Sequence, residues 1–437
     1  MRNKVLLYAP PIVEFGTSMS DVHDGELLYL GQYFFNLNYD VNVLDHYANP
    51  NKYSLEHFSP DVLIVHLWKN ALIKNKNLHI VLERLVGYKL LNKKVEIILI
   101  GSIAVGLHEE ILKYYKETID AIVSSHAFYL SNKDELLIPL NVIQEYYTLP
   151  IILTDEYLST SPVDLDENDV VSVFSSRGCR KGCSFCSYNK DISKWTKREV
   201  PSLINDINLL HKYFKVRRFG LFDNNFGNDL LINRERSELL ADGINELSFS
   251  VNLSLNISLD GIDEVVLKNF RRANVDSILI GLESLNPDTL EKIYNKPTDI
   301  VKAQKMVQYA EDIGITPVIS YILFQPYLTF SQLKNELRLI EMFGRYRIIQ
   351  FLSRSVLIVN SGTKMEKMLK RDGLLITHDL FYRDFIFLDQ KVASIYKVLQ
   401  EYVNDNFRKY NTSTYKISKL KYQEWNLVKS LVDNVNS

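Results

Sequence analysis

The sequence predicts an α/β protein with three parts in order: a doubly wound, Rossmann-like parallel sheet, a partial (β/α)6 barrel of the TIM type, and a small helical C-terminal region. Two observations support this prediction. Short apolar runs rich in β-branched residues alternate with helical patterns, first up to residue 150 and again from residue 168 to residue 365. The chain also has 437 residues, of which 46% are hydrophobic, and this is enough to supply more than one core.

The first domain is expected over residues 1–150. Its strands are predicted at apolar runs, which cover residues 4–8, 40–44, 62–67, 95–100 and 121–124. Its helices are predicted where apolar residues recur with helical spacing, over residues 25–36, 80–91 and 109–118. This alternation indicates a parallel sheet with helices on both faces, and such sheets bind ligands beyond the carboxyl ends of their strands.

A linker is expected over residues 151–167, where prolines and acidic residues interrupt the apolar pattern. The barrel is expected over residues 168–365. Its strands are predicted at 170–174, 218–222, 248–256, 277–281, 317–324 and 347–359, the last of them broken. The region over residues 366–437 is expected to be helical, with helices at 391–407 and 420–435.

The only three cysteines of the chain, Cys179, Cys183 and Cys186, lie in the loop after the first barrel strand. Three thiolates complete neither a tetrahedral zinc site nor a set of disulfides. They can hold three irons of a four-iron cluster and leave the fourth iron open to a small ligand. A structural role, or a zinc site completed by a histidine, is the other interpretation, but the chain has no second pair of closely spaced cysteines.

The spacing CxxxCxxC, with the aromatic Phe185 directly before the last cysteine, resembles the signature of radical S-adenosylmethionine (SAM) enzymes. The resemblance implies a [4Fe-4S] cluster held by the three cysteines, with the methionyl group of SAM on the open iron. One electron from the reduced cluster then cleaves SAM into methionine and a 5′-deoxyadenosyl radical. The backbone of Phe185 is expected near the adenine of SAM.

Polar residues that follow the barrel strands are the further candidates for the SAM site, because active sites of such barrels lie at the carboxyl ends of the strands. Asp223 and Asn224 follow the second strand and are expected to receive hydrogen bonds from the methionyl ammonium. Asn256 follows the third strand, and Glu283 and Ser284 follow the fourth, where they can bond the ribose or the methionyl group. For Asp223, a role as a helix cap or turn residue stays open.

Beyond the cysteines, the order of several short segments resembles the subfamily in which a cobalamin-binding domain precedes the radical SAM barrel. These segments are Pro10-Pro11, Gly-Glu-Leu-Leu-Tyr-Leu at 25–30, Gly101-Ser102, Asp-Asn-Asn-Phe at 223–226, Gly-Leu-Glu-Ser at 281–284 and Ser-Gly-Thr at 361–363. Each of them is weak alone, since such residues mark turns in many folds. Together they span roughly residues 4–375.

The candidates for contacts with cobalamin are His66 and Trp68, at the end of the third strand, and Gly101 and Ser102, after the fourth. The Asp-x-His-x-x-Gly motif of histidine-ligated cobalamin domains is not satisfied at residues 45–47, so no axial histidine is predicted from that motif. Structural roles for His66 and Trp68 stay open. A domain of this kind can also persist as a scaffold after it has lost its ligand.

The leading functional hypothesis is therefore a cobalamin-dependent radical SAM enzyme that methylates an unactivated carbon in a natural product, lipid or cofactor precursor. One alternative is a radical SAM enzyme that works without cobalamin in a rearrangement, cyclisation, epimerisation or dehydration. A second alternative, of another class, is a non-enzymatic iron–sulfur electron carrier or sensor, which requires a fourth protein ligand.

The charge balance and hydropathy limit the expected partners. The chain has 51 Lys and Arg against 53 Asp and Glu, so no overall basic field for nucleic acid is predicted. No run of apolar residues reaches the length of a membrane span, and a cytoplasmic location is expected. The expected partners are a small-molecule or peptide substrate and a reductase such as flavodoxin or ferredoxin.

Overall fold

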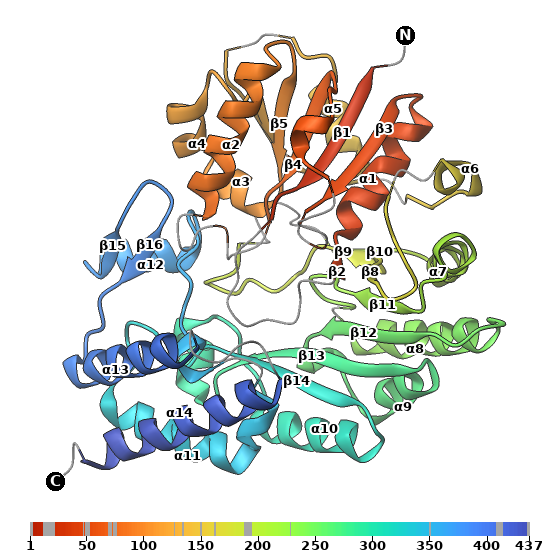
Figure 1. Ribbon diagram of the computed structural model, residues 1–437. Helices are drawn as coiled ribbons and strands as arrows, with labels where there is room; N and C mark the ends of the chain where they lie inside the picture. The colour runs from red at the N-terminus through yellow and green to blue at the C-terminus, as the bar shows by residue number, and fades with distance from the viewer. Residues whose placement is uncertain are drawn as a thin grey trace. The chain divides into compact units, whose positions relative to one another are not determined.

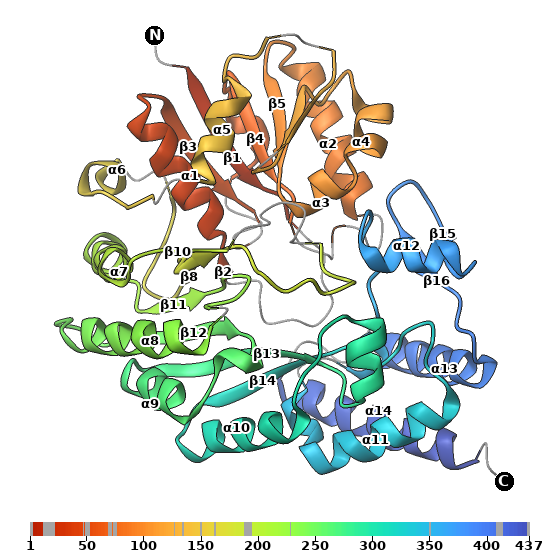
Figure 2. The ribbon, with the colours of Figure 1, turned by 180° about the vertical axis from the view of Figure 1, so that it is seen from behind.

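The structure is a computed structural model, shown in Figures 1 and 2. It describes residues 3–11, 22–46, 48, 53–68, 72, 77–125, 127–132, 135–148, 151–160, 163–187, 195–227, 229–348, 351–407 and 414–434. The chain divides into two compact units, and each is described by itself. The first unit comprises Met1–Arg180, Ser187–Ser277 and Leu380–Tyr382, and the second comprises Lys181–Cys186, Ile278–Asp379 and Arg383–Ser437.

The N-terminal part of the first unit contains a six-stranded sheet of order β3-β1-β4-β5-β6-β7. The strands are β1 (Lys4–Ala9), β3 (Asp40–Asp45), β4 (Val62–His66), β5 (Glu96–Ile100), β6 (Ala121–Val123) and β7 (Phe128–Leu130). All neighbours are parallel except β6 and β7, which pair antiparallel at the edge. Every residue of β4 and β5 is buried, as expected for central strands of a sheet covered on both faces.

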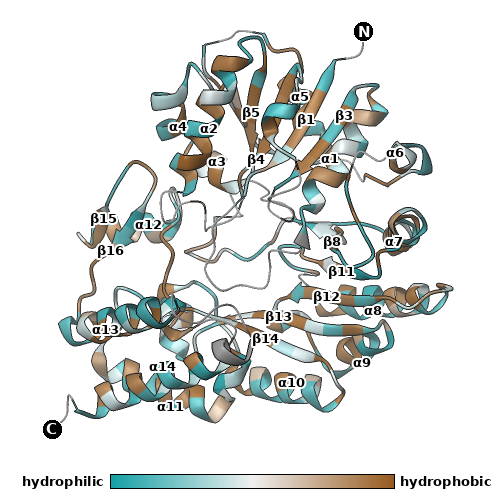
Figure 3. Ribbon diagram, in the orientation of Figure 1, coloured by the Kyte–Doolittle hydropathy of each residue, from teal (hydrophilic) through white to brown (hydrophobic). Residues whose placement is uncertain are grey.

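Helices cover both faces of this sheet, as Figures 1 and 2 show. They are α1 (Gly25–Asn36), α2 (Asn77–Leu91), α3 (Ser102–Gly106), α4 (His108–Tyr115) and α5 (Leu140–Tyr146). Helix α1 starts where the side chain of Asp24 accepts a hydrogen bond from the backbone N–H of Glu26, a normal helix cap. Figure 3 shows the apolar residues concentrated along the strands, where they form the core.

A second parallel sheet in the first unit has neighbouring strands in the order β12-β11-β8-β2. Its strands are β2 (Val22–His23), β8 (Val170–Ser172), β11 (Arg218–Leu221) and β12 (Asn252–Ile257). Strand β2 comes from the start of the chain and pairs with β8. The short strands β9 (Ser176–Arg177) and β10 (Thr196–Lys197) pair antiparallel, and the helices are α6 (Asp155–Ser159), α7 (Val200–Phe214), α8 (Leu230–Asn245) and α9 (Glu264–Arg272).

The second unit continues the strand–helix alternation. Strand β13 (Val275–Glu283) begins in the first unit and ends in the second, where β14 (Thr316–Tyr321) is its neighbour. The helices are α10 (Ile300–Asp312), α11 (Phe330–Phe343), α12 (Lys364–Arg371), α13 (Gln390–Phe407) and α14 (Thr414–Asn434), and a π-helical turn covers Thr289–Ile293. Phe351, Val403 and Leu420 form an apolar cluster. It packs α13 and α14 against the segment that contains Phe351.

The predicted α/β class is confirmed, with a parallel sheet in the N-terminal region and another in the barrel region. The sixth barrel strand, expected at 347–359 as a broken strand, is reduced to isolated parallel bridges in the described part of that segment. In the described part of that segment the backbone forms 3-10 turns at Arg345–Arg347 and Leu352–Arg354 and two isolated bridges, Ile319↔Ile348 and Phe324↔Val356. The Ser355 N–H bonds back to the carbonyls of Phe351 and Leu352, so the segment turns instead of extending.

Two further segments differ from the expectations. The segment 151–167, expected as an unpacked linker, contains helix α6, in which Tyr157 and Leu158 are fully buried. The C-terminal region, expected to be helical, also contains an antiparallel hairpin of β15 (Leu375–Thr377) and β16 (Arg383–Phe385). Both elements are too short to produce a periodic apolar pattern. Among the described residues, no helix has the length and apolar character that crossing a membrane requires.

Candidate functional site

The three cysteines lie on the loop that follows β9. Each is half-buried, and none of them forms a disulfide. The chain passes from the first unit to the second after Arg180, so Cys179 belongs to the first unit and Cys183 and Cys186 to the second. No three His, Cys, Asp or Glu side chains converge into a ready-made metal site within the described ranges. The assignment of the cysteines as cluster ligands therefore rests on their spacing and on the family match given below.

Asp223 anchors the start of this loop in the first unit. Its Oδ1 accepts a hydrogen bond of 3.0 Å from the Ser175 backbone N–H, and its Oδ2 accepts a short bond from the Ser175 hydroxyl. Asp223 is almost completely buried, and this burial raises the pKa of its carboxyl group, while the Ser175 hydroxyl partly offsets the rise. Both carboxylate oxygens thus have partners in the protein, and we interpret Asp223 as a residue that positions the loop.

Asn224 and Asn256 lie beside Asp223, at the carboxyl ends of β11 and β12. Asn256 donates a hydrogen bond of 3.2 Å from Nδ2 to the backbone carbonyl of Asp223. Asn225, which the sequence did not single out, accepts at its carbonyl from the Ser176 hydroxyl and from the Trp195 indole. Asn224 and Asn256 are half-buried, so their amides can reach a ligand at this end of the sheet.

In the second unit, Ser184 and Phe185 fix the other end of the cysteine loop. The Ser184 N–H donates to the Tyr294 carbonyl over 2.9 Å, and its hydroxyl donates to the Ile293 carbonyl over 2.5 Å. The Phe185 ring packs edge-on against Tyr294 with a centroid distance of 5.4 Å. Its backbone carbonyl accepts a bond of 3.3 Å from Asn360 Nδ2. The ring of Phe185 is therefore a packing element, while its backbone is part of the loop.

Glu283 ends β13 with an unusual backbone. Its φ is 70°, a left-handed conformation that non-glycine residues adopt rarely and at some cost in energy. Its Oε1 accepts a hydrogen bond of 2.9 Å from the Lys296 ammonium. Lys296 could not be selected from the sequence, because it lies past a helical segment and only the fold brings it to Glu283.

Ser284 follows Glu283 and is bonded to a buried acid. Its hydroxyl donates to Oε1 of Glu336 over 2.5 Å, and Oε2 of Glu336 accepts a short bond from the Tyr321 hydroxyl. Burial raises the pKa of Glu336, and the two hydroxyl donors partly offset the rise. The Tyr321 oxygen also accepts from the Leu285 N–H over 2.9 Å. This network fixes the backbone just after β13.

The four candidates for contacts with cobalamin lie together at the carboxyl ends of β4 and β5. His66 Nδ1 lies 2.7 Å from Oδ2 of Asp24, and Trp68 Nε1 donates to the same oxygen over 3.1 Å. The His66 and Trp68 rings are stacked with an interplanar angle of 23°. Asp24, which also caps α1, was missed by the sequence analysis because its partners are about 40 residues away along the chain.

Gly101 and Ser102 follow β5 at the same edge. Gly101 has φ of 97°, and a Cβ there would lie 2.6 Å from the Leu67 carbonyl oxygen and 2.8 Å from the His66 ring. A larger residue would therefore displace the His66 ring or the backbone after β4. The Ser102 hydroxyl lies 3.4 Å from the Trp68 carbonyl, a weak hydrogen bond.

A buried histidine lies close to this edge. His23, in β2, lies between two carboxylates: Nδ1 is 3.4 Å from Asp45 Oδ2, and Nε2 is 3.3 Å from Asp169 Oδ1. Burial opposes the charged form, but the two carboxylates outweigh it and raise the pKa of His23 to about 9. At neutral pH the ring is therefore an imidazolium. Since Asp45 ends β3 and Asp169 precedes β8, this cation links the two sheets of the first unit.

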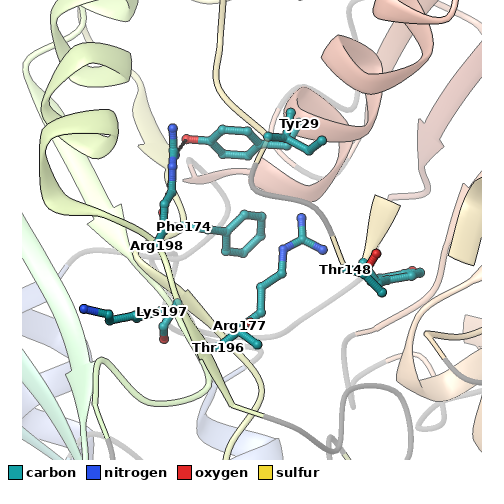
Figure 4. Close-up of a pocket in the computed structure, with 10 residues that line it drawn as sticks. Tyr29, Thr148, Phe174, Arg177, Thr196, Lys197 and Arg198 are labelled. Atoms are coloured by element: carbon teal, nitrogen blue, oxygen red, sulfur yellow. Dashed lines mark hydrogen bonds between the residues drawn. The ribbon is translucent and has the colours of Figure 1, made fainter. Parts of the chain in front are cut away.

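Figure 4 shows a pocket of about 140 Å³ in the first unit that has three basic side chains in its wall. Each has an acidic partner. Arg177 lies 3.3 Å from Glu26 Oε1, Arg198 lies 2.5 Å from Asp206 Oδ2, and Lys197 lies 3.5 Å from Glu199. The dashed line in Figure 4 marks the bond of 3.0 Å from Arg198 to the Tyr29 hydroxyl. These pairs neutralise the wall, and we assign the pocket no ligand.

Part of the chain matches the model of a known protein family. Residues 173–340 match the family model described as the radical SAM superfamily. This range begins directly before the cysteine loop and ends within α11. This part of the chain is therefore similar to the radical SAM superfamily, whose members use a [4Fe-4S] cluster and SAM.

Two curated proteins are similar to about half of this chain. Over 243 residues the chain is 23% identical to an uncharacterized methyltransferase of Pyrococcus horikoshii, covering 55% of this chain and 50% of the relative. Over 258 residues it is 26% identical to the bacteriochlorophyllide d C-8(2)-methyltransferase of Chlorobaculum tepidum, covering 55% of this chain and 54% of that enzyme. The chain thus spans about half the length of these relatives.

Among solved structures, the cobalamin-dependent SAM radical enzyme OxsB, with aqua-cobalamin and SAM bound, has a similar fold. The TM-score is 0.69 at 13% identity, and the alignment covers 99% of this chain and 72% of OxsB. The likeness extends over the N-terminal sheet as well as the radical SAM domain. The order of parts that the sequence predicts is therefore the order found in a cobalamin-dependent member of the superfamily.

Proposed function

We propose that the chain is a cobalamin-dependent radical SAM enzyme that methylates an unactivated carbon of an organic molecule. One observation carries the proposal: a doubly wound sheet, with His66 and Trp68 at its carboxyl edge, precedes a radical SAM domain in a chain whose fold resembles OxsB along nearly its whole length. The two curated relatives that are named methyltransferases support methyl transfer as the outcome.

The residues of the cysteine loop suit an anionic cluster. Cys179, Cys183 and Cys186 would bind its irons, and Lys296 follows Asn295, whose side chain donates to the Gly182 carbonyl directly before Cys183. SAM would be held by Glu283, Ser284, Asn224 and Asn256, with the backbone of Phe185 near its adenine. Asp223 would keep the loop in place through Ser175.

The carboxyl edge of β4 and β5 suits a flat cofactor. The stacked His66 and Trp68 rings are fixed by one carboxylate, and Gly101 lets the backbone come close to the His66 ring. Ligands of doubly wound sheets bind at this kind of edge. We assign His66, Trp68, Gly101 and Ser102 to contacts with cobalamin, with Asp24 as the residue that orients the two rings.

When bound, the cluster and SAM supply a 5′-deoxyadenosyl radical, and cobalamin carries the methyl group. The chain's own residues bind and orient these groups and exclude water from them. Glu283 would receive hydrogen bonds from SAM in addition to that from Lys296, and the buried bonds of Ser284 and Glu336 would keep that loop rigid. The substrate is expected to be a natural-product, lipid or cofactor precursor, and a flavodoxin or ferredoxin would deliver the electron.

An anaerobic reconstitution tests the proposal. The full chain is loaded with iron and sulfide and incubated with dithionite and SAM, with and without hydroxocobalamin. We expect 5′-deoxyadenosine to form and a corrin spectrum to stay with the protein after gel filtration. The Cys183→Ala variant is the matched control, and we expect it to form no 5′-deoxyadenosine.

Three outcomes distinguish the hypotheses. A loaded cluster that never produces 5′-deoxyadenosine contradicts the radical assignment and favours an electron carrier or sensor. Formation of 5′-deoxyadenosine without any retained corrin favours the cobalamin-independent alternative. Formation of 5′-deoxyadenosine together with retained corrin supports the proposal, and label transfer from methyl-labelled SAM to a candidate substrate then identifies the methylation.

A further inference from the structure

Lys296 is held in the second unit by two acceptors near the end of β13. Its Nζ donates to the Gly281 carbonyl over 2.6 Å and to Glu283 Oε1 over 2.9 Å. The exposed fractions of the two side chains are 15% for Lys296 and 8% for Glu283, so the ion pair is largely shielded from water. An ammonium has three N–H donors, and these two bonds use two of them. Among the described residues, no acceptor takes the third N–H, so it is available to a group that binds here.

Gly281 makes room for this ion pair. A Cβ at Gly281 would lie 2.6 Å from Glu283 Oε1 and 2.8 Å from Lys296 Nζ, closer than any real contact. The left-handed backbone of Glu283, with φ of 70°, places its carboxylate on the same side. The missing side chain of Gly281 and the left-handed backbone of Glu283 therefore both help to place the Lys296 ammonium. Backbone strain of this kind clusters at functional sites.

The segment that carries Lys296 is joined to the cysteine loop by hydrogen bonds to backbone carbonyls. Ser184 bonds to the carbonyls of Tyr294 and Ile293, as described above, and Asn295 Nδ2 donates to the Gly182 carbonyl over 2.8 Å. Asn295 itself has φ of 49°, which turns the chain sharply before Lys296. The position of the ammonium is therefore fixed relative to Cys183 and Cys186 by three hydrogen bonds.

The groups around Lys296 favour its charged form. Burial opposes the charged form, but Glu283 and, more weakly, the sulfurs of Cys183 and Cys186 raise the pKa of Lys296. The ammonium lies on the segment whose residues bond the Gly182 carbonyl and the Ser184 N–H, on either side of Cys183.

We propose that Lys296 is a positioning residue that raises the reduction potential of the cluster on Cys179, Cys183 and Cys186. Reduction adds one electron, taken from an external donor such as dithionite or flavodoxin, and makes the cluster more negative by one charge. A fixed cation beside it stabilises the reduced form more than the oxidised form. This inference rests on the proposed function, because it requires the cluster.

The test is a redox titration of the reconstituted full chain followed by electron paramagnetic resonance. We expect Lys296→Met to disfavour reduction at least tenfold, a fall of about 59 mV in the midpoint potential of a one-electron couple. Lys296→Arg keeps the charge and is expected to restore most of the potential. Lys292→Met is the matched control, because Lys292 lies one helical turn earlier, is exposed and pairs with Asp288 over 2.7 Å. We expect Lys292→Met to leave the potential unchanged.

Iron and sulfide content is measured in each protein, so that loss of the cluster is not mistaken for a shift in its potential. If Lys296→Met takes up no cluster, the Gly281→Ala variant provides the test. Its added methyl group displaces the Lys296 ammonium but keeps the positive charge, and we expect a smaller fall in the midpoint potential. An unchanged potential in whichever of these variants is loaded overturns the inference. A wild-type chain that takes up no [4Fe-4S] cluster contradicts the proposed function itself, whereas a loaded wild type whose potential the variants do not alter contradicts only the role of Lys296.

Discussion

Asp223 and Glu283 differ in ways that their sequence context does not reveal. Both are buried acids at the carboxyl end of a parallel strand, Asp223 after β11 in the first unit and Glu283 at the end of β13 in the second. Asp223 accepts its bonds from the neutral N–H and hydroxyl of Ser175. Glu283 accepts its bond from the ammonium of Lys296.

The partners decide what each acid can do. Burial raises the pKa of Asp223, and the Ser175 donors and the charge of Arg236 only partly offset this rise, so the carboxyl group is a fixed acceptor inside the fold. Glu283 is kept near a cation and adopts a strained backbone, a combination typical of a site that binds a charged ligand. A carboxylate at a strand end is therefore a weak indication of ligand binding until its protein partners are known.

The first prediction concerns the stability that His23 contributes to the first unit through its ion pairs with Asp45 and Asp169. His23 has a folded pKa of about 9 against an unfolded value of 6.5, so the folded protein binds the proton more tightly. Its contribution to stability is fully present below pH 6.5 and is lost as the pH rises through 9. A shift of this size corresponds to about 3 kcal/mol at most.

Urea unfolding between pH 6 and pH 10 measures this contribution. We expect the difference in unfolding free energy between the wild type and His23→Gln to shrink over that range. His57→Gln, at an exposed histidine of the same unit, is the control and is expected to give a constant difference. A constant difference for His23→Gln would show that the carboxylates of Asp45 and Asp169 do not hold the proton.

The second prediction concerns Asp223. Asp223→Ala leaves the buried N–H and hydroxyl of Ser175 without acceptors, and we expect a loss of about 1–3 kcal/mol in unfolding free energy. Iron uptake is expected to fall with it, since Ser175 directly precedes β9, which leads into the cysteine loop. Asp276→Asn, at an exposed acid, is the control for urea unfolding. Unchanged stability combined with weaker SAM binding would return Asp223 to the role of a SAM ligand.

The third prediction concerns Glu283. Glu283→Gln removes the acceptor charge at the proposed SAM site, and we expect SAM to bind at least tenfold more weakly, a difference of about 1.4 kcal/mol. Equilibrium dialysis of the reconstituted protein measures the affinity, and circular dichroism checks that the variant is folded. Glu291→Gln, at an exposed acid in the π-helical turn, is expected to bind SAM normally. Equal affinity in both variants would exclude Glu283 from the SAM site.

The fold was predictable where burial leaves a continuous pattern. The apolar runs at 62–67 and 95–100 correspond to the fully buried β4 and β5, and the helical pattern at 25–36 corresponds to α1. Strand β2 has two residues, which is too short for any periodicity to show. The expected strand at 347–359 has the apolar composition of a strand, but local bonds made by Ser355 turn it.

The candidate site was predictable only in part, because its partners are distant in sequence. The spacing of the cysteines is local and is visible in the sequence. The bond from His66 to Asp24 spans 42 residues, and the pairing of Lys296 with Glu283 depends on a π-helical turn and on Gly281. Such contacts follow from the tertiary fold and leave no local pattern.

The last prediction concerns Asp24, whose carboxylate, like that of Asp223, is hydrogen-bonded by more than one group of the protein. Asp24→Asn keeps an oxygen that can cap α1 but places an amide N–H₂ against His66 and Trp68, so their common acceptor is lost. If the two rings contact cobalamin, we expect the corrin to be retained several-fold less well, a loss of about 1 kcal/mol.

Asp40→Asn, at the exposed start of β3, is the control. The corrin spectrum after gel filtration measures retention. Because Asp24 is not among the residues proposed to hold the cluster or SAM, formation of 5′-deoxyadenosine should persist in Asp24→Asn. A parallel loss of both would mean that Asp24 supports the fold instead of the cofactor.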